Sequence, residues 1–534
     1  MLVLRVIRTR SNPFPSSQAQ RIRVRRQPFS STGKRERGRD LPLVPLWIKG
    51  ERVTTSSGGT VFTKNSKTGK ESCEVVVAGE EEVDSAIRES RRAFDEWRDK
   101  TGWERKAVLS KVVDLLPDRF GALTEALRAD AAFSEIVVQG DRKSALHLTD
   151  GAALTAASIE GGIPQTVDGS FAITTREPFG PALSIPAFNY PLTLALRSIV
   201  YPLACGNSVI VKSSPLIPQL YHLLGPLFRD AGLPAGTLQI LNFSEKDVAA
   251  RVEQMISDDD VRMINFTGSV RLGKILAAKC GEHLKPSVME LGGKSVAIVL
   301  PSADLKLAAN NILFGAFLNS GQICMSTEQV LVHQDIAAEF EKVLRTTADE
   351  AGWNGGMQLV RPGAGDAAKE LADDAVDSGA QVLFSATSPT ASPSSSSSSA
   401  SSYPPTIISS LPDTASLSTT ESFSPILTLH LFPSTSSILS HANSHKTGLT
   451  ASVFTNDLSQ ALNVAKKLET GAVHINGMTI HDQANLPHGG WKESGWGRFN
   501  GKGAIQSFTQ SKNIRVILPG KESMLPLHAI YGGM

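Results

Sequence analysis

The residues of this chain that could do chemistry centre on Cys324. It ends the run Gly321-Gln322-Ile323-Cys324 and is one of only four cysteines in 534 residues. A thiol attacks as its thiolate, so it needs a base or a favourable field nearby. Glu290 lies upstream between the apolar Met289 and Leu291, and burial there should raise the pKa of its carboxyl into the range of a general base. The sequence therefore suggests Cys324 as a nucleophile and Glu290 as its base.

Asn189 is a third candidate for catalysis. It follows a short apolar run at 182–186 and precedes Pro191, and its amide could donate to an oxyanion. Each of the three residues also fits an ordinary structural role. Cys324 could be a packed thiol, Glu290 a buried carboxylate with a basic partner, and Asn189 a turn residue.

A cofactor site is suggested by the run from Gly268 and Ser269 to Gly273. This run follows an apolar segment at 262–266 and opens a predicted helix, whose free N–H groups favour a pyrophosphate. A Gly-Ser pair also simply caps helices, and no GxGxxG fingerprint is present. Lys212, at the end of a predicted strand, could bond ribose hydroxyls or be a solvated edge residue.

The elements that position these residues alternate between strand and helix. Apolar runs at 182–186, 207–212, 238–241 and 262–266 are separated by helical patterns. Such a rhythm predicts a doubly wound parallel sheet, in which ligands bind at the carboxyl ends of the strands. Asn189, Lys212 and Gly268 all fall at such ends.

Length and composition favour a large α/β enzyme. The 534 residues are 41% hydrophobic with 44 glycines, which suggests two or three lobes. The four cysteines form no CxxC pair and the histidines no HExxH, so we expect a reducing compartment and no metal site. A serine-rich stretch at 385–402 is typical of a surface insertion.

Residues 1–40 differ from the rest of the chain. They hold ten arginines and Lys34 against two acidic residues, Glu36 and Asp40. This composition is typical of a mitochondrial transit peptide and predicts a mitochondrial location. The alternatives are a disordered basic tail on a cytoplasmic protein, or a misassigned start. The remainder is net acidic, so we expect no nucleic-acid partner, and no apolar run is long enough to predict a membrane span.

Several motifs together resemble the aldehyde dehydrogenase superfamily, from about residue 46 to 517. The similar segments are Ile185-Pro186-Ala187-Phe188-Asn189-Tyr190-Pro191, Phe266-Thr267-Gly268-Ser269, Glu290-Leu291-Gly292-Gly293-Lys294, Gly321-Gln322-Ile323-Cys324, Glu421-Ser422-Phe423-Ser424-Pro425 and Gly489-Gly490-Trp491-Lys492-Glu493-Ser494-Gly495. The segment 481–490 is most similar to salicylaldehyde, benzaldehyde and vanillin dehydrogenases.

The resemblance implies a fold and a set of domains. A Rossmann-type doubly wound dinucleotide-binding domain would span 46–290, with an oligomerisation hairpin around 160–178. A catalytic α/β domain would span 291–490, and residues 491–534 would return to the first domain and form a small β oligomerisation arm. The strand at 507–517 would then join subunits into a homodimer or homotetramer.

The resemblance also implies the chemistry. Cys324 would form a thiohemiacetal and then a thioester, with the oxyanion held by the Asn189 amide and the Cys324 backbone N–H, and Glu290 would activate the hydrolytic water. NAD or NADP would contact Phe188, Lys212, Ser269, Glu421 and Phe423, besides Gly268 and Gly273. Pro215 stands where many NAD-preferring members have Glu, which leaves the choice of cofactor open.

Two departures from the family pattern bear on activity. Ser424 replaces a usual Gly, and the segment 351–366 is shortened and lacks the expected Gly-Asp-Pro pattern. The expected substrate is an aromatic or other apolar aldehyde. The alternatives are a semialdehyde dehydrogenase of amino-acid catabolism, and a catalytically weakened scaffold of the same fold.

Overall fold

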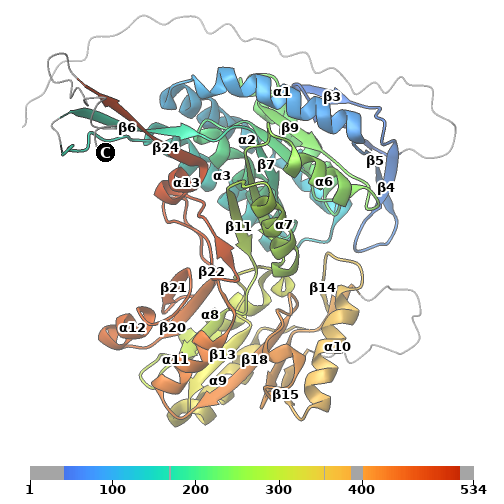
Figure 1. Ribbon diagram of the computed structural model, residues 1–534. Coiled ribbons are helices and arrows are strands. Elements are labelled where there is room, and N and C mark those ends of the chain that lie inside the picture. Colours follow the sequence, from blue (N-terminus) through green and yellow to red (C-terminus); the bar gives the residue numbers. More distant parts are fainter. Residues whose placement is uncertain (1–40, 168–169, 354, 387–400, 518–534) are drawn as a thin grey trace, which may run out of the picture. The chain divides into compact units, whose positions relative to one another are not determined.

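Two β-sheets organise the chain in this computed structural model, which describes residues 41–167, 170–353, 355–386 and 401–517 (Figure 1). The first sheet has eight strands, in the order β23-β11-β10-β7-β8-β9-β2-β3. Its strands are β2 (Leu46–Ile48), β3 (Glu51–Val53), β7 (Ala182–Ile185), β8 (Val209–Lys212), β9 (Leu238–Leu241), β10 (Met263–Gly268), β11 (Ser287–Leu291) and β23 (Gly495–Trp496). The five central strands are parallel, and β2 and β23 add antiparallel edges.

Both faces of the first sheet are buried. On β8, Val209 and Val211 belong to one apolar cluster and Ile210 to another. Because successive side chains of a strand point to opposite faces, the two clusters lie on opposite sides of the sheet. The helices of this part are α1 (Glu80–Arg98), α2 (Gly102–Asp130), α3 (Glu135–Ala157), α4 (Pro191–Ala204), α5 (Pro218–Asp230), α6 (Val248–Ser257) and α7 (Val270–Glu282).

The second sheet has seven strands, in the order β15-β17-β18-β13-β12-β20-β21. They are β12 (Val296–Val299), β13 (Gln329–His333), β15 (Gln381–Ser385), β17 (Thr406–Ser409), β18 (Ile426–Phe432), β20 (Thr450–Phe454) and β21 (Ala472–Ile475). All pairs are parallel except β15 with β17. The accompanying helices are α8 (Leu305–Phe317), α9 (Ala337–Glu350), α10 (Ala364–Asp377), α11 (Thr435–Ser444) and α12 (Leu458–Ala465).

The C-terminal part of the described chain returns to earlier elements. β22 (Trp491–Lys492) pairs with β19 (Thr447–Gly448), and β23 joins the edge of the first sheet beside β11. After α13 (Gly501–Phe508), β24 (Thr509–Val516) pairs antiparallel with β6 (Phe171–Pro178). Figure 1 shows β6 and β24 as a two-stranded ribbon apart from the two large sheets.

Smaller strands complete the structure. β1 (Leu43–Val44), β5 (Glu71–Val76) and β4 (Thr60–Lys64) form a three-stranded sheet, and β14 (Met357–Gln358) pairs with β16 (Ser402–Tyr403).

The predicted fold class is confirmed: both halves are α/β with mainly parallel sheets. The apolar runs predicted as strands appear as β7, β8, β9 and β10, and Pro191 opens α4 as expected. The domain boundaries stay predictions. Residues 1–40 and 387–400 of the serine-rich stretch lie outside the described residues. Within the described part of the chain, no helix has the length and hydropathy needed to cross a membrane.

Candidate active site

Cys324 lies in a tight loop after α8. The turn Leu318–Gly321 contains three consecutive left-handed residues, with φ of 51° at Asn319, 59° at Ser320 and 73° at Gly321. A Cβ on Gly321 would overlap the carbonyl oxygen of Ser424. Only glycine therefore fits that position without displacing the backbone that follows the Glu421–Phe423 segment.

Hydrogen bonds join this loop to Asn189. The Asn189 side-chain amide donates to the carbonyl oxygen of Gln322 at 2.8 Å, and the Asn319 amide donates to the carbonyl oxygen of Asn189 at 2.7 Å. The Gln322 side-chain oxygen accepts from the backbone N–H of Val360 at 2.8 Å. An Asn amide has two N–H groups, so one remains for an oxyanion.

Asn189 is itself positioned by a buried cap on α4. The Asp141 carboxylate, on α3, accepts from the backbone N–H groups of Leu192 and Thr193 at 2.9 and 2.8 Å. These are N–H groups of the first turn, which have no partner within the helix. Burial raises the pKa of Asp141 to about 6, against the hydrogen bonds it accepts.

Glu290 lies in β11 and is 1% exposed. Its carboxylate accepts three hydrogen bonds: from the Cys324 thiol at 3.4 Å, from Arg197 at 3.2 Å and from the His488 imidazole at 3.4 Å. The sequence-based pairing of Cys324 with Glu290 thus corresponds to a direct contact between the two side chains.

The expectation that the pKa of Glu290 is raised is wrong. Burial does push this pKa upward, but the hydrogen bond from His488 and the charge of Arg197 outweigh it and bring the pKa to about 2. Burial and the neighbouring carboxylate raise the pKa of Cys324 well above the usual value. The resting pair is therefore a neutral thiol beside an anionic carboxylate that can accept its proton.

Arg197, Asp482 and His488 are site residues that the sequence-based analysis missed. Arg197 is 3% exposed and spans the Glu290 and Asp482 carboxylates, at 3.2 Å from each. Asp482 also accepts from the Asn500 amide at 2.6 Å. A lone arginine in the otherwise apolar helix 191–204 was a usable signal, because a buried cation requires a partner. His488, between Pro487 and Gly489, carried no such signal.

The thiol opens onto a cavity of about 690 Å³. Asn189, Arg197, Cys324, Asp482 and His488 all line it, whereas Glu290 does not. Much of the remaining wall is apolar, from Leu194, Leu318, Ile323, Met325, Met478 and Ile480. Three basic side chains also face the cavity: Lys143, His147 and His481.

Two predicted cofactor residues end parallel strands of the first sheet. Ser269 caps α7, its hydroxyl accepting from the backbone N–H of Leu272 at 3.4 Å. Lys212 ends β8, where burial lowers the pKa of its ammonium to about 8, and within the described ranges no ion pair to it is found. A helix N-terminus and a desolvated cation at the carboxyl ends of the same sheet, with β7 between their strands, fit a pyrophosphate and ribose.

Gly268 and Gly273 have clear packing roles. A Cβ on Gly268 would meet the ring of Phe266, and a Cβ on Gly273 would meet the side chain of Leu291. Gly273 therefore allows α7 to approach β11, the strand that carries Glu290. Contact of either glycine with a cofactor stays a prediction.

Glu421, Phe423 and Phe188 lie on the other predicted cofactor segments. The Phe188 and Phe423 rings meet edge to face, with centroids 6.2 Å apart. A Cβ on Gly292 would overlap the Glu421 carboxylate. Burial and the charge of Glu328 raise the pKa of Glu421 to about 8.

A buried ion pair holds the Glu421–Phe423 segment in place. Lys294 contacts the Glu328 carboxylate at 2.6 Å and the carbonyl oxygen of Thr420 at 2.8 Å. The same carboxylate accepts from the backbone N–H groups of Ser422 and Phe423, at 2.8 and 3.2 Å. The sequence-based analysis did not single out Glu328.

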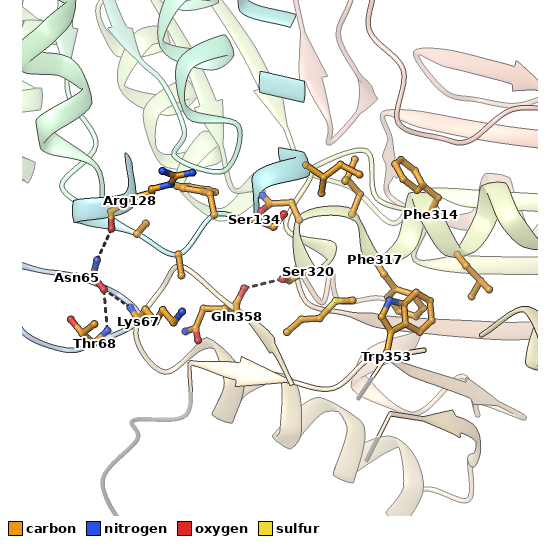
Figure 2. Close-up of a pocket in the computed structure, with 18 residues that line it drawn as sticks. Asn65, Lys67, Thr68, Arg128, Ser134, Phe314, Phe317, Ser320, Trp353 and Gln358 are labelled. Carbon is orange, nitrogen blue, oxygen red and sulfur yellow. Dashed lines mark hydrogen bonds between the residues drawn. The ribbon is translucent and has the colours of Figure 1, made fainter. Parts of the chain in front are cut away.

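A second cavity, of about 740 Å³, lies beyond the 318–320 turn (Figure 2). Leu318 lines both cavities, but neither Cys324 nor Glu290 lines this one. Figure 2 shows Trp353 against Phe317 and the bond from the Ser320 hydroxyl to the carbonyl oxygen of Gln358, 2.8 Å long. The shortened segment 351–366 therefore braces the catalytic loop.

One group of side chains could in principle hold a cation. Ligand atoms of Glu253, Glu282 and His283 lie within 4.8 Å of one another. The ammonium of Lys279 contacts both carboxylates, at 3.0 and 3.1 Å. A lysine already neutralises this cluster, so it gives no reason to assign a metal.

Known proteins share this architecture. Residues 53–514 match the family model described as the aldehyde dehydrogenase family. Vanillin dehydrogenase of Pseudomonas fluorescens is 36% identical over 474 residues, which is 88% of this chain and 96% of that protein. Benzaldehyde dehydrogenase [NAD(+)] of Pseudomonas putida is 33% identical and covers 83% of this chain and 90% of its own length. A solved salicylaldehyde dehydrogenase from Pseudomonas putida G7, complexed with salicylaldehyde, superposes with a TM-score of 0.85 at 32% identity, over 91% of this chain and 99% of that one.

A cysteine with an adjacent carboxylate base, on a fold of this kind, defines an oxidoreductase that acts on aldehydes with NAD or NADP. The chain belongs to the aldehyde dehydrogenase family.

The comparisons correct the predicted mitochondrial location, which is wrong. The vanillin and benzaldehyde dehydrogenase relatives are proteins of Pseudomonas, and bacteria have no mitochondria. Residues 1–40, on which the prediction rested, lie outside the described residues.

Proposed function

We propose that the chain oxidises aromatic aldehydes to carboxylic acids through a covalent intermediate on Cys324. The observation that carries this proposal is the 3.4 Å contact between the Cys324 thiol and the anionic Glu290, at the wall of a largely apolar cavity. The first step forms a bond between Sγ and the aldehyde carbon, while the thiol proton passes to Glu290. The spare N–H of Asn189 and the backbone N–H of Cys324 stabilise the resulting oxyanion.

The second half of the reaction releases the acid. A bound NAD or NADP would supply the hydride acceptor, and loss of the hydride from the substrate carbon leaves a thioester on Cys324. Glu290, once deprotonated again, removes a proton from water as the water oxygen attacks the thioester carbon. The C–S bond then breaks, the Cys324 sulfur takes up the proton of the product acid, and the product leaves as a carboxylate. Sulfur suits both steps because a thiolate is a strong nucleophile and a fair leaving group.

The cofactor is proposed to lie along the carboxyl ends of the first sheet. Ser269 and the N-terminus of α7 would face its phosphates, and Lys212 its ribose hydroxyls. Phe188, Glu421 and Phe423 would contact its nicotinamide half. With Pro215 after Lys212, no carboxylate at that position repels a 2′-phosphate. We therefore expect both NAD and NADP to be accepted.

The cavity favours an aromatic substrate that carries a polar substituent. Its apolar wall suits a ring, and Lys143 and His147, one turn apart on α3, can hydrogen-bond a hydroxyl. Vanillin and salicylaldehyde, which appear in the names of two similar enzymes, each combine an aromatic ring with a hydroxyl group. A semialdehyde needs a cation for its carboxylate. Arg197 already spans Glu290 and Asp482, which leaves Lys143 for that role, so the apolar wall is the feature that favours an aromatic aldehyde. The weakened-scaffold alternative is disfavoured by the Cys324–Glu290 contact and the braced loop.

Domains and assembly remain proposals. We propose that 46–290 binds the cofactor, that 291–490 carries the nucleophile, and that 491–534 returns to the first domain. The β6–β24 ribbon exposes Phe171, Ile514 and Val516, each at least 40% accessible. Exposed apolar side chains on a two-stranded ribbon favour contact with a second copy, in a homodimer or homotetramer.

An assay of cofactor reduction tests the proposal. The purified chain is offered benzaldehyde, salicylaldehyde, vanillin, succinic semialdehyde and glutamic semialdehyde, each with NAD and with NADP. We expect the highest kcat/KM with the hydroxylated aromatic aldehydes. Highest turnover with a semialdehyde would refute the substrate proposal. A folded chain that binds cofactor but reduces none with any aldehyde would refute the enzyme function.

A further inference from the structure

Gly140 lies inside the 23-residue helix α3, where a glycine is less favourable than an alanine. A Cβ at this position would lie 2.5 Å from the hydroxyl oxygen of Tyr190 and 3.8 Å from the ring carbon that bears it. The first distance is a clash, whereas the second is an ordinary van der Waals contact. Position 140 therefore lacks a side chain because residue 190 carries a phenol hydroxyl.

Tyr190 forms part of the wall of the catalytic cavity. It lines this cavity together with Gly140 and Ser144, and it packs in the same small apolar cluster as Cys324. Of the described residues that line the cavity, Tyr190 alone carries a benzene ring. It therefore offers an aromatic substrate a flat ring to pack against, whereas the rest of the apolar wall is aliphatic.

Helix α3 holds the hydroxyl end of the Tyr190 ring. This hydroxyl is hydrogen-bonded to Ser144, one turn after Gly140. Burial raises the pKa of the phenol to about 12, so the group stays neutral at the pH of an assay. The space at Gly140 and the bond to Ser144 together keep the ring against α3.

The backbone on both sides of Tyr190 is fixed. Asn189 is hydrogen-bonded to the catalytic loop through its side chain and through its carbonyl oxygen. The first turn of α4 is held by the Asp141 carboxylate, which follows Gly140 on α3. Crowding at Gly140 must therefore be relieved by the side chain of Tyr190, and the cavity is the open space beside that ring.

We infer that Gly140 and Tyr190 together determine how wide a substituted aromatic ring the catalytic cavity accepts. Tyr190 contacts the substrate ring, and Gly140 is a positioning residue that acts through the Tyr190 hydroxyl. The ligand class that this pair admits is an aromatic aldehyde with a hydroxyl or methoxy substituent. This role rests on the proposed function.

Gly140→Ala should push the Tyr190 ring into the cavity. The KM for vanillin should rise and its kcat/KM should fall roughly 10-fold, since a mismatch of about one methyl group in an apolar pocket has effects of this size. Propanal has no ring to accommodate, so its kcat/KM should fall far less. Rates of cofactor reduction with the two aldehydes give the ratio of their kcat/KM values.

Tyr190→Phe supplies a matched background. Without the hydroxyl, the nearest atom of residue 190 to the new Cβ is the ring carbon at 3.8 Å. Gly140→Ala should then cause no further loss of kcat/KM for vanillin relative to Tyr190→Phe alone. In thermal unfolding, the alanine should lower Tm when Tyr190 is present and raise it in the Tyr190→Phe background, through its higher helix propensity.

Gly121→Ala is the control for a glycine-to-alanine change in a helix. A Cβ on Gly121, in α2, meets nothing within 4 Å, so this variant should leave the ratio of vanillin to propanal kcat/KM unchanged.

The outcomes separate this inference from the proposed function. An inactive wild-type chain would refute the function itself. In an active chain, equal losses with vanillin and propanal would show that Gly140→Ala only disturbs the fold, and would overturn the inference. A vanillin-specific loss that persists in full in the Tyr190→Phe background would overturn it as well.

Discussion

Three charged side chains and one imidazole surround the reacting sulfur. Glu290 is buried but stays anionic because Arg197 and His488 donate to it, and Arg197 is balanced in turn by Asp482. Buried charges are tolerated only when they are paired in this way. The consequence for Cys324 is a thiol that keeps its proton until substrate is in place.

Removal of Arg197 should lower the free energy of unfolding, because it leaves the buried carboxylate without its cation. Arg197→Met leaves the buried Glu290 carboxylate with less compensation, so we expect a loss of about 3–5 kcal/mol in the free energy of unfolding. Denaturant titration measures it. The matched control is Arg119→Met, which removes an exposed pair with Asp230 and should cost about 0–1 kcal/mol. Equal effects of the two substitutions would contradict a structural role for the buried network.

The reactivity of Cys324 should depend on pH in a defined direction. Because burial and Glu290 raise its pKa, alkylation by iodoacetamide without cofactor should be slow at neutral pH and accelerate as pH rises. Glu290→Gln removes the neighbouring negative charge, which lowers the thiol pKa and should speed alkylation at neutral pH. Peptide mass spectrometry distinguishes Cys324 from the three buried cysteines. Slower alkylation in Glu290→Gln would contradict the assigned electrostatics.

At the scale of elements, strand ends and helix starts carry the site. Lys212 ends β8, Glu290 lies in β11, Ser269 caps α7, and Asn189 precedes α4. The packing of α7 on β11 is close because Gly273 has no side chain. The position of Glu290 therefore depends on how closely α7 packs on β11.

Two glycines of α7 provide a matched test of that packing. A Cβ on Gly273 would meet Leu291, whereas a Cβ on Gly281 meets nothing within 4 Å. Gly281→Ala should stabilise the protein by about 0.5–1 kcal/mol through helix propensity. Gly273→Ala should instead destabilise it by roughly 1–3 kcal/mol through overpacking, and lower kcat. Thermal unfolding and steady-state kinetics measure both, and a stabilising Gly273→Ala would refute close packing at this position.

Sequence patterns predicted the strands and the site residues better than they predicted which side chains contact one another. Buried parallel strands appear as continuous apolar runs, so β7 to β10 were found, and the joint motifs identified Cys324, Glu290 and Asn189. The pKa of Glu290 was predicted in the wrong direction because its partners lie far away in sequence, at Arg197 and His488. The local sequence pattern predicts that a residue is buried, but it does not predict which charged residue from elsewhere in the chain will lie next to it in the fold.

At the scale of the whole molecule, the β6–β24 ribbon is the proposed assembly surface. Ile514 pairs with Ile173 and Val516 with Phe171, and the side chains of Phe171, Ile514 and Val516 are exposed. Ile514→Lys with Val516→Lys should shift the chain to a smaller assembly in light scattering, since buried lysines oppose association. Leu458→Lys, at an exposed position on α12, is the control and should leave the mass unchanged. An unaltered mass in the double variant would place the interface elsewhere.

The central claim is that the substrate carbon becomes bonded to Cys324. The most direct test is intact and peptide mass spectrometry of Glu290→Gln after mixing with an aromatic aldehyde and cofactor. In this variant the thiol, whose pKa is lower without the neighbouring carboxylate, loses its proton to solvent at raised pH. Glutamine cannot activate water, so the thioester should accumulate, and the peptide that contains Cys324 should gain the mass of the acyl group. Cys324→Ala should gain nothing. An acyl group on any other residue, or its absence while cofactor is reduced, would contradict the account.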